Sequence, residues 1–206
     1  MSGCVSHDHD CGDVGCAGSS LFKSINHAAV RCLNASDPGS APLVLRPWER
    51  RHEREPALES NEDDGELLLH IPFVSDVKLQ GIVVAGGPEG SSPTSMRVFI
   101  NRDDLDFGLA GELPALQEWS LSEDGSANLE YQTRFSRFQC VSSLDIHFPG
   151  NGGAARTCVF FVGLRGVADP HASREALTNV VYESRPRPQD HRTPAGEAAH
   201  AQRLGQ

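Results

Sequence analysis

Long apolar runs are missing from the sequence, both at its start and elsewhere. The residues after Met1 read SGCVSHDHDCGDVGC, a polar stretch, and no segment approaches the roughly 20 apolar residues of a membrane span. We therefore expect neither a secretory signal nor insertion into a membrane. The predicted location is the cytoplasm, with the nucleus left open as a second one.

Cysteine pairs at redox or zinc-binding spacing are also missing. The chain has six cysteines but no CxxC pair, and without a secretory signal they are predicted to be reduced thiols. Residues 1–20 contain acids and small residues and nothing that could form a core, so we predict a flexible arm. This arm does carry thiol and imidazole groups, at Cys4, His7, His9, Cys11 and Cys16. Because a zinc ion needs three or four such ligands to converge, zinc in the arm stays an open alternative, and no other cofactor is predicted.

Positive charge is scarce relative to negative charge. The chain has 18 Lys and Arg against 28 Asp and Glu, which gives a formal net charge of −10. A general nucleic-acid binder or a binder of anionic membranes needs a cationic face to neutralise phosphate, so both classes are excluded. A basic surface on a protein partner is the natural complement. The alternative is that the acidity only keeps the protein soluble.

The sequence also lacks the usual signs of a catalytic nucleophile. It has no GxSxG elbow and no cysteine in a recognisable catalytic context. Cys140 and Cys158 fall in predicted strands and are interpreted as core thiols. His70 and His147 each lie inside an apolar strand, where a single histidine usually occupies the polar face or is hydrogen-bonded in the core. We predict that the protein is not an enzyme.

The most informative stretch runs from residue 59 to residue 85. It opens with acids that are predicted to form an exposed rim, namely Glu59, Glu62, Asp63, Asp64 and Glu66. The most apolar part of the chain follows directly. Its branched residues predict two strands, 67–73 and 77–84, separated by a break at 74–76 and placed at the centre of a β-sheet.

Further strand-length segments recur between Gly, Pro, Asn and Ser residues. They are 96–101, 117–121, 129–135, 140–148, 158–164 and 179–183. With no long helical pattern between them, about eight or nine strands are expected, and the fold class is all-β, a single antiparallel β-sandwich with jelly-roll topology and disordered termini. The domain is predicted to span 21–183 and a disordered tail 184–206. Within the domain, the apolar spacing of 21–34 predicts a short amphipathic helix or a turn leading into the domain, and Trp48 is predicted to anchor the loop-rich segment around it in the core.

Several segments together resemble the PITH domain, the proteasome-interacting thioredoxin family. They are RCLN at 31–34, ESNEDDGELLLHIPF at 59–73, VKLQGI at 77–82, MRVFINR at 96–102, TRFSRFQCVSSLDIHF at 133–148, FFVGLRG at 160–166 and TNVVYESRPRPQDH at 178–191. The resemblance covers nearly the whole predicted domain, and the chain is similar to the members without a thioredoxin domain. It implies a jelly-roll similar to galactose-binding-like domains, and a non-catalytic module that docks on the regulatory particle of the proteasome and modulates protein turnover.

Two functions follow as hypotheses. The first is an interaction protein, expected to be a monomer, that binds the proteasome or another large assembly. Its contact residues would be the predicted acidic rim and the tail residues His191 and His200, whose imidazoles could also enter a metal site on the partner. The second is a module that binds a sugar or another small polar ligand in loops at one end of the jelly roll. Trp119 is the aromatic residue expected to be exposed there.

Overall fold

The computed structural model describes residues 19–62, 64–123 and 125–173, with side chains described up to residue 168. Its strands are β1 (Ser19–Ser20), β2 (Arg31–Leu33), β3 (Leu58–Glu59), β4 (Leu67–Gly86), β5 (Ser95–Ile100), β6 (Gln117–Ser120), β7 (Glu130–Gln132), β8 (Val141–Phe148) and β9 (Cys158–Ser173). One short α-helix, α1 (Phe107–Glu112), and short 3-10 turns lie between them. These turns are η1 (Phe22–Ser24), η2 (His27–Ala29), η3 (Pro38–Val44), η4 (Trp48–Arg50) and η5 (Phe135–Arg137). Most of the predicted arm, the predicted strand at 179–183 and the predicted tail lie outside the described residues, so the proposed domain limits stay predictions.

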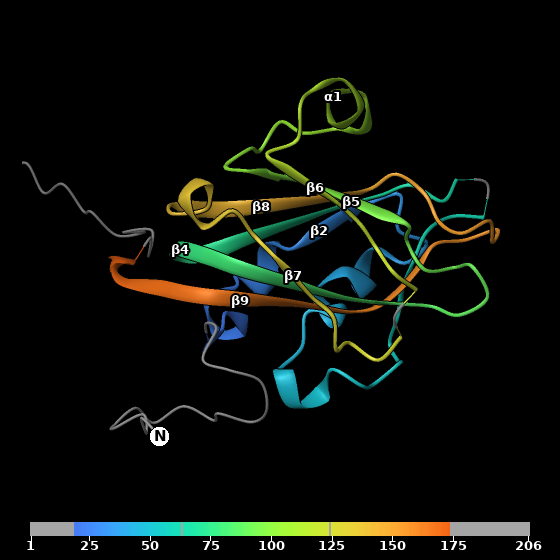
Figure 1. Ribbon diagram of the computed structural model, residues 1–206, viewed down its shortest axis with the longest axis horizontal. Helices are drawn as coiled ribbons and strands as arrows, with labels where there is room; N and C mark the ends of the chain where they lie inside the picture. Colours follow the sequence, from blue (N-terminus) through green and yellow to red (C-terminus); the bar gives the residue numbers. More distant parts are fainter. Residues whose placement is uncertain (1–18, 63, 124, 174–206) are drawn as a thin grey trace, which may run out of the picture. The chain divides into compact units, whose positions relative to one another are not determined.

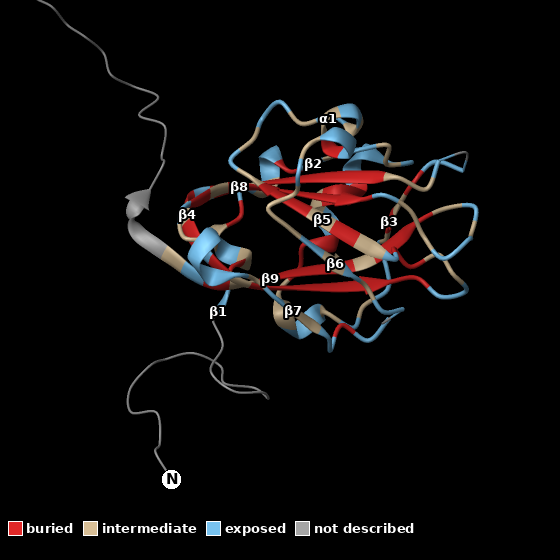
Figure 2. Cartoon of the chain, turned by 45° about the horizontal axis from the view of Figure 1, so that its top comes forward, coloured by how far each residue is buried: buried red, intermediate tan, exposed pale blue. Residues whose placement is uncertain are grey.

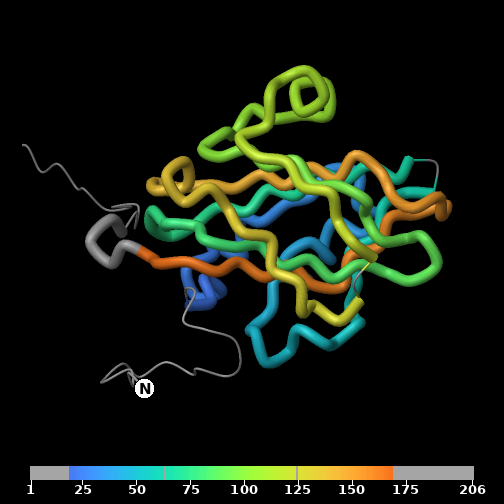
Figure 3. The backbone as a smooth tube through the Cα atoms, viewed as in Figure 1, coloured from blue at the N-terminus to red at the C-terminus, as the bar shows by residue number. Residues whose placement is uncertain are grey.

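Strand β4 runs through the whole sandwich (Figure 1, Figure 3). Its first half, Leu67 to Pro72, pairs with β8, and its second half, from Val77 onward, pairs with β9. The register shifts against β8 between Pro72 and Val77, which is where the sequence predicted a break. The prediction of two separate strands is therefore wrong. The interruption is an irregularity at which one continuous strand changes partners.

A second shift keeps the apolar side chains of β4 on the core side. The register against β9 shifts between Leu79 and Gly81. Inward-facing residues have odd numbers as far as Leu79 and even numbers from Ile82 onward. Because side chains alternate along a strand, one extra residue is what lets both halves of the strand face the same core.

The described strands form one antiparallel sheet that curls into two facing layers. Their order is β1-β9-β4-β8-β5-β6, with β2 and β7 also paired to β4 and β3 paired to β9. Figure 2 shows that the buried residues concentrate on the strands of the two layers, while the connections are mostly exposed. The predicted all-β antiparallel sandwich is confirmed.

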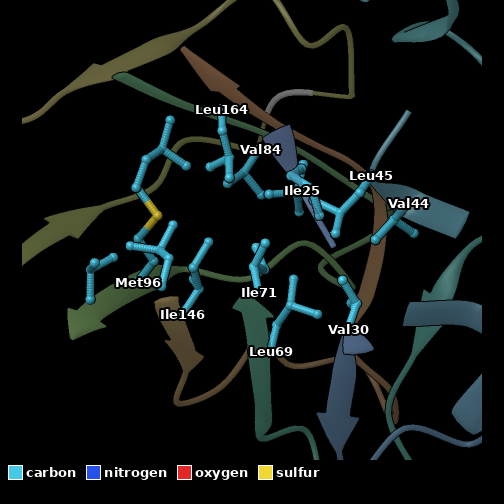
Figure 4. Close-up of a cluster of buried hydrophobic side chains, with 14 of the residues drawn as sticks. Ile25, Val30, Val44, Leu45, Leu69, Ile71, Val84, Met96, Ile146 and Leu164 are labelled. Carbon is cyan, nitrogen blue, oxygen red and sulfur yellow. The ribbon is translucent and has the colours of Figure 1, made fainter. Parts of the chain in front are cut away.

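The main core fills the space between the layers. Leu69 and Ile71 of β4 and Ile146 of β8 lie close to Val84 and Leu164 of the opposite layer (Figure 4). All five side chains are at most 4% exposed. The alternation of apolar residues in these strands, visible in the sequence, is thus what places the core.

Segment 21–34 follows the second of its two predicted alternatives, a turn and not an amphipathic helix. It forms two 3-10 turns followed by β2, and the apolar residues Leu21, Ile25 and Val30 are buried as predicted. Ile25 makes a bridge to Phe73, and β2 pairs with residues 68–70 of β4. Sheet pairing with a neighbouring strand has overridden the weak helical spacing.

Trp48 does hold its segment to the body, but it is half-buried and not a core residue as predicted. Its ring packs edge-on against Phe161 at a centroid distance of 6.2 Å. Trp48 and Phe160 cover a small second cluster formed by Val83, Ala85, Ala127 and Phe161. This cluster lies on the outer side of the β4–β9 layer.

Helix α1 lies in the connection between β5 and β6. Asp106 caps it, because its Oδ1 accepts a hydrogen bond of 2.8 Å from the Leu109 backbone N–H. In Figure 1, α1 lies on the side of β8 and β5, whereas η4 lies beyond β9. Within the described part of the chain, no helix is both long and apolar enough to span a membrane.

Candidate functional site

The predicted acidic rim is the loop that joins β3 to β4, residues 59–66, called here the acidic loop. Its start is fixed to the beginning of β9. The Ser60 backbone N–H donates to the Thr157 carbonyl at 2.9 Å, and the Thr157 N–H donates to Ser60 Oγ at 3.0 Å. Ser60 and Thr157 are fully buried. The loop is therefore anchored in the body of the protein and is not a loose connection.

Asn34 fixes the other end of the acidic loop. Its side-chain amide donates to the carbonyls of Asp64 and Glu66, at 2.9 and 2.7 Å, and its Oδ1 accepts from Asn61 Nδ2 at 2.7 Å. The Asn34 backbone has a φ of 62°, which asparagine tolerates better than most residues. No pattern in the sequence indicates this role of Asn34, although Asn34 ends the RCLN segment that resembles the PITH family.

Arg156 partly neutralises the acidic loop. Its guanidinium contacts Glu59 Oε2 at 3.3 Å and Glu62 Oε1 at 2.5 Å. The Glu62 side chain is still 70% exposed. Asp64 is also exposed, and its Oδ1 accepts from the Glu66 N–H at 2.9 Å. These two acids face solvent in a fixed backbone, and Asp63 lies outside the described residues.

Glu66 differs from the other acids of the loop, and the prediction that it belongs to an exposed rim is wrong. Its Oε1 lies 2.5 Å from Nε2 of His147, whose side chain is only 2% exposed. The side chain turns inward because the loop enters β4 at this point, beside the end of β8. Glu66 is thus a partner of a buried histidine.

His147 belongs to a layer of polar residues on the outer face of β4, β8 and β5, called here the polar layer. It comprises His70, Arg97, Asp145 and His147. His70 and Asp145 are register partners, and Nδ1 of His70 lies 2.7 Å from Oδ1 of Asp145. Each histidine was expected either on the polar face of its strand or hydrogen-bonded in the core; both lie on the outer face, where they are buried and hydrogen-bonded. Sequence analysis missed their carboxylate partners, because these are distant in the chain.

Helix α1 covers the polar layer. Arg97 donates to carbonyls at the end of the helix, Ala110 at 2.5 Å and Leu113 at 2.9 Å. The ring of Phe107 lies 6.3 Å from that of His147. Most polar atoms of the layer bind the protein's own groups, which indicates a structural network, although Asp145 Oδ2 and His147 Nδ1 are buried without a hydrogen-bond partner among the described residues.

Two of the described cysteines, Cys32 and Cys158, are not activated as nucleophiles. Burial raises the pKa of the Cys32 thiol to about 12 and that of Cys158 to about 11, so both are protonated at neutral pH. Cys158 is buried, as predicted. Cys140 is exposed, against the prediction, because it lies just before β8 begins. No group of His, Cys, Asp and Glu within residues 19–62, 64–123 and 125–173 is arranged to hold a metal ion.

Asp145 is expected to make stability depend on pH. Burial raises the pKa of its carboxyl, an effect that the hydrogen bond from His70 opposes, with Arg31 and Asp103 contributing less. A raised pKa in the folded state means that folding favours the protonated acid, so the stabilisation is present at low pH and is lost as pH rises through the folded pKa. Asp145→Asn cannot ionise. The stability of the variant relative to wild type should therefore rise with pH above about 4, the ordinary pKa of Asp.

Urea unfolding at a series of pH values measures this difference. Asp104→Asn is the control, because Asp104 is an exposed acid whose pKa its partner Arg102 lowers. A stability difference between Asp145→Asn and wild type that stays constant from acid to neutral pH would contradict the expectation.

The remaining predicted residues do not join this site. Cys4, His7, His9, Cys11, Cys16, His191 and His200 lie outside the described residues. Trp119, expected in an exposed loop, lies in β6, packs against the main core, and donates from Nε1 to the Gln132 carbonyl at 3.2 Å. The prediction that Trp119 is exposed in a loop where it could contact a sugar is therefore wrong.

Comparison with known proteins identifies relatives over most of the chain. The family model for the PITH domain matches residues 13–186. PITH domain-containing protein 1 of Homo sapiens is 37% identical over 202 residues, which cover 91% of this chain and 94% of that protein. The proteins of the same name from Xenopus laevis and Dictyostelium discoideum are 41% and 34% identical, over 84% of this chain and 81% and 85% of theirs.

Solved structures that share the fold include carbohydrate-binding domains and a chitobiase domain. The CBM32-1 and CBM32-2 domains of Clostridium perfringens ZmpB, in complex with GalNAc, match 71% of this chain and 35% of theirs with a TM-score of 0.53 and 8% identity. The C-terminal domain of a Bacteroides fragilis chitobiase matches 73% of this chain and 99% of its own with a TM-score of 0.51 and 16% identity. At such low identity the likeness shows the fold alone, and the predicted jelly roll is confirmed.

Proposed function

Because the chain belongs to the PITH domain family, we propose that it is a non-catalytic interaction module that docks on the regulatory particle of the proteasome and modulates protein turnover. The family name supports the choice of partner. The curated relatives are named for their domain and not for an enzymatic reaction. The proposal further takes the protein to act as a monomer in the cytoplasm, with the nucleus as a second location.

The observation that carries the proposal is the fixed geometry of the acidic loop. Asn34, Ser60 and Thr157 hold its backbone, and Glu62 and Asp64 remain exposed on it. A loop that is already ordered loses little conformational entropy on binding. Its exposed carboxylates can steer the encounter with a basic surface and increase the association rate at low salt.

The test removes charge from the acidic loop without changing its shape. In the triple variant Glu59→Gln, Glu62→Gln, Asp64→Asn, side chains keep their size and their hydrogen-bond acceptors. Glu66 is left unchanged because it is bound to His147. The matched control, Glu89→Gln, Glu112→Gln, Glu118→Gln, removes three charges from exposed acids outside the loop.

Tagged full-length protein is expected to capture proteasome particles from cell extract, and the control variant should capture as much. The triple variant should recover at least about tenfold less, since the steering charge is gone. Equal recovery with the triple variant would show that the acids are only a solvated rim. Failure of wild type to recover any particle would defeat the proposed partner.

The tail is proposed as a second contact. His191 and His200 can supply neutral imidazole, a ready ligand for a metal site on the partner. Deleting residues 184–206 is expected to weaken capture, and substituting alanine for both histidines tests the imidazoles separately. If both variants recover as many particles as wild type, the tail has no part in docking.

The sugar-bound neighbours share the fold at low identity, and Trp119, the residue that would have favoured a sugar site, packs against the core.

A further inference from the structure

Arginine and aromatic side chains gather on the outer side of the β4–β9 layer. The guanidinium carbons of Arg51 and Arg165 lie over the Trp48 ring, 4.6 and 5.0 Å from its centroid. The guanidinium carbon of Arg54 lies 5.9 Å from the centroid of the Phe160 ring. These five residues are called here the arginine–aromatic patch. Stacking of this kind holds cations in place while leaving their N–H groups available.

Arg51 and Arg54 are unusual in this acidic protein. Most of the other arginines in the described residues form an ion pair with a carboxylate, as Arg50 does with Glu53 and Arg102 with Asp104. Within the described part of the chain, neither Arg51 nor Arg54 forms an ion pair with Asp or Glu. Arg54 is exposed and Arg51 half-exposed, and although Nη1 of Arg51 donates to the Trp48 carbonyl at 3.2 Å, both guanidinium groups can donate to an outside carboxylate.

The segment that carries the patch is fixed in place before any partner binds. Arg46 is 6% exposed and donates to the carbonyls of Leu43, Glu53, Pro56 and Phe160. These bonds tie both ends of residues 43–56 to each other and to β9. The patch is therefore preorganised, and binding to it costs little ordering entropy.

A small pocket opens beside Arg54. Its volume is about 220 Å³, and it is lined by Arg54, Phe160, Gly125, Glu123 and the turn at 86–88. Gly86 and Gly87 form part of its wall with bare backbone, since a Cβ at Gly87 would lie 2.9 Å from that of Cys158. Pockets for free small molecules usually have volumes of about 300–1,000 Å³. This pocket is the size for one side chain of a larger partner.

We propose that the arginine–aromatic patch binds an acidic peptide segment of a partner protein, with one side chain of the segment in the pocket and its carboxylates on Arg51 and Arg54. The half-buried Trp48, flanked by arginines, has the composition of a binding hot spot. The charges complement each other, because two unpaired cations meet an anionic segment.

A nucleic acid fits the patch less well than a peptide does. Glu49, Glu53 and Glu55 lie in the same segment, Glu123 lines the pocket, and Glu130 lies 3.8 Å from Arg165. With the net charge of −10, these acids repel a polymer that carries one charge per nucleotide. A peptide can place a few carboxylates on the two arginines and apolar side chains elsewhere.

Selection from a phage-displayed library of short random peptides against the full-length protein tests the proposal. Enriched sequences should be acidic, and fluorescein-labelled synthetic copies should bind wild-type protein in fluorescence anisotropy. The variant Arg51→Gln, Arg54→Gln should weaken this binding at least about tenfold, since each lost charge-assisted hydrogen bond can account for that factor. The control Arg134→Gln, Arg137→Gln removes two exposed arginines elsewhere and should change nothing.

Three outcomes overturn the proposal: no enrichment of acidic sequences, equal affinity for wild type and the patch variant, or displacement of the peptides by a thymidine oligonucleotide at equal concentration. Melting curves check that the double variant folds. Arg54→Gln alone serves if it does not, because the described structure gives the Arg54 side chain no hydrogen bond to lose. The patch is separate from the acidic loop, so loss of proteasome capture in the loop variant and loss of peptide binding in the patch variant are distinguishable results.

Discussion

Replacing Arg46 by Ala is expected to lower the free energy of unfolding by about 3–5 kcal/mol, as when one partner of a buried charged network is removed. Arg46 donates to four carbonyls, including those of Leu43 and Glu53 at 2.8 and 2.9 Å and that of Phe160 at 3.0 Å. The carbonyls would be left without their donor in a site that is nearly closed to water, and unsatisfied buried groups of this kind are costly.

Urea unfolding measures the loss. Arg46→Lys is the informative comparison, because an ammonium keeps the charge but cannot reach four carbonyls in the planar geometry of guanidinium. We expect it to recover only a small part of the stability. Arg137→Ala, at an exposed arginine, should stay within about 0.5 kcal/mol of wild type. If Arg46→Ala does the same, Arg46 does not hold the segment.

Replacing Ile71 by Ala is expected to lower the free energy of unfolding by about 2–5 kcal/mol. Ile71 is completely buried in the first half of β4, opposite Leu144 of β8, and lies in the middle of the core shown in Figure 4. Truncation removes three carbon atoms from the space between the two layers. Hydrogen bonds between neighbouring strands hold each layer in place. The layers cannot close around the space, so a cavity remains.

Val74→Ala provides the control in the same strand. Val74 is 45% exposed and follows Ile71 by three residues, so its truncation should cost about 0.5 kcal/mol or less. Thermal melting or urea unfolding of the two variants separates burial from strand propensity. Similar losses for both would mean that Ile71 is not part of the core.

The sequence predicted the strands well where apolar residues alternate over a buried face. The segments that became β5, β6, β8 and β9 lie where alternation and turn residues placed them. It was wrong about β4 because residues 74–76 interrupt the apolar run without ending the strand. Inward and outward residues continue to alternate through them, and the same strand continues into the second layer.

The candidate site was predictable only in part. A run of acids indicates a charged loop, and Glu62 and Asp64 are exposed on it. The inward turn of Glu66 depends on His147, which is 81 residues away in the chain. Similarly, nothing in the sequence around Arg46 indicates its four carbonyl acceptors, and only the fold brings them together. Long-range partners of this kind leave no local pattern in a single sequence.

Binding of the full-length protein to purified proteasome regulatory particles, measured at increasing salt concentrations, tests the docking proposal most directly. We expect wild type and the Glu89, Glu112, Glu118 control to bind alike and to weaken as salt screens the steering charges. The variant neutralised at Glu59, Glu62 and Asp64 should bind at least about tenfold more weakly at low salt and lose most of the salt dependence. Undiminished affinity of that variant, or no binding by wild type at any salt concentration, would contradict the account.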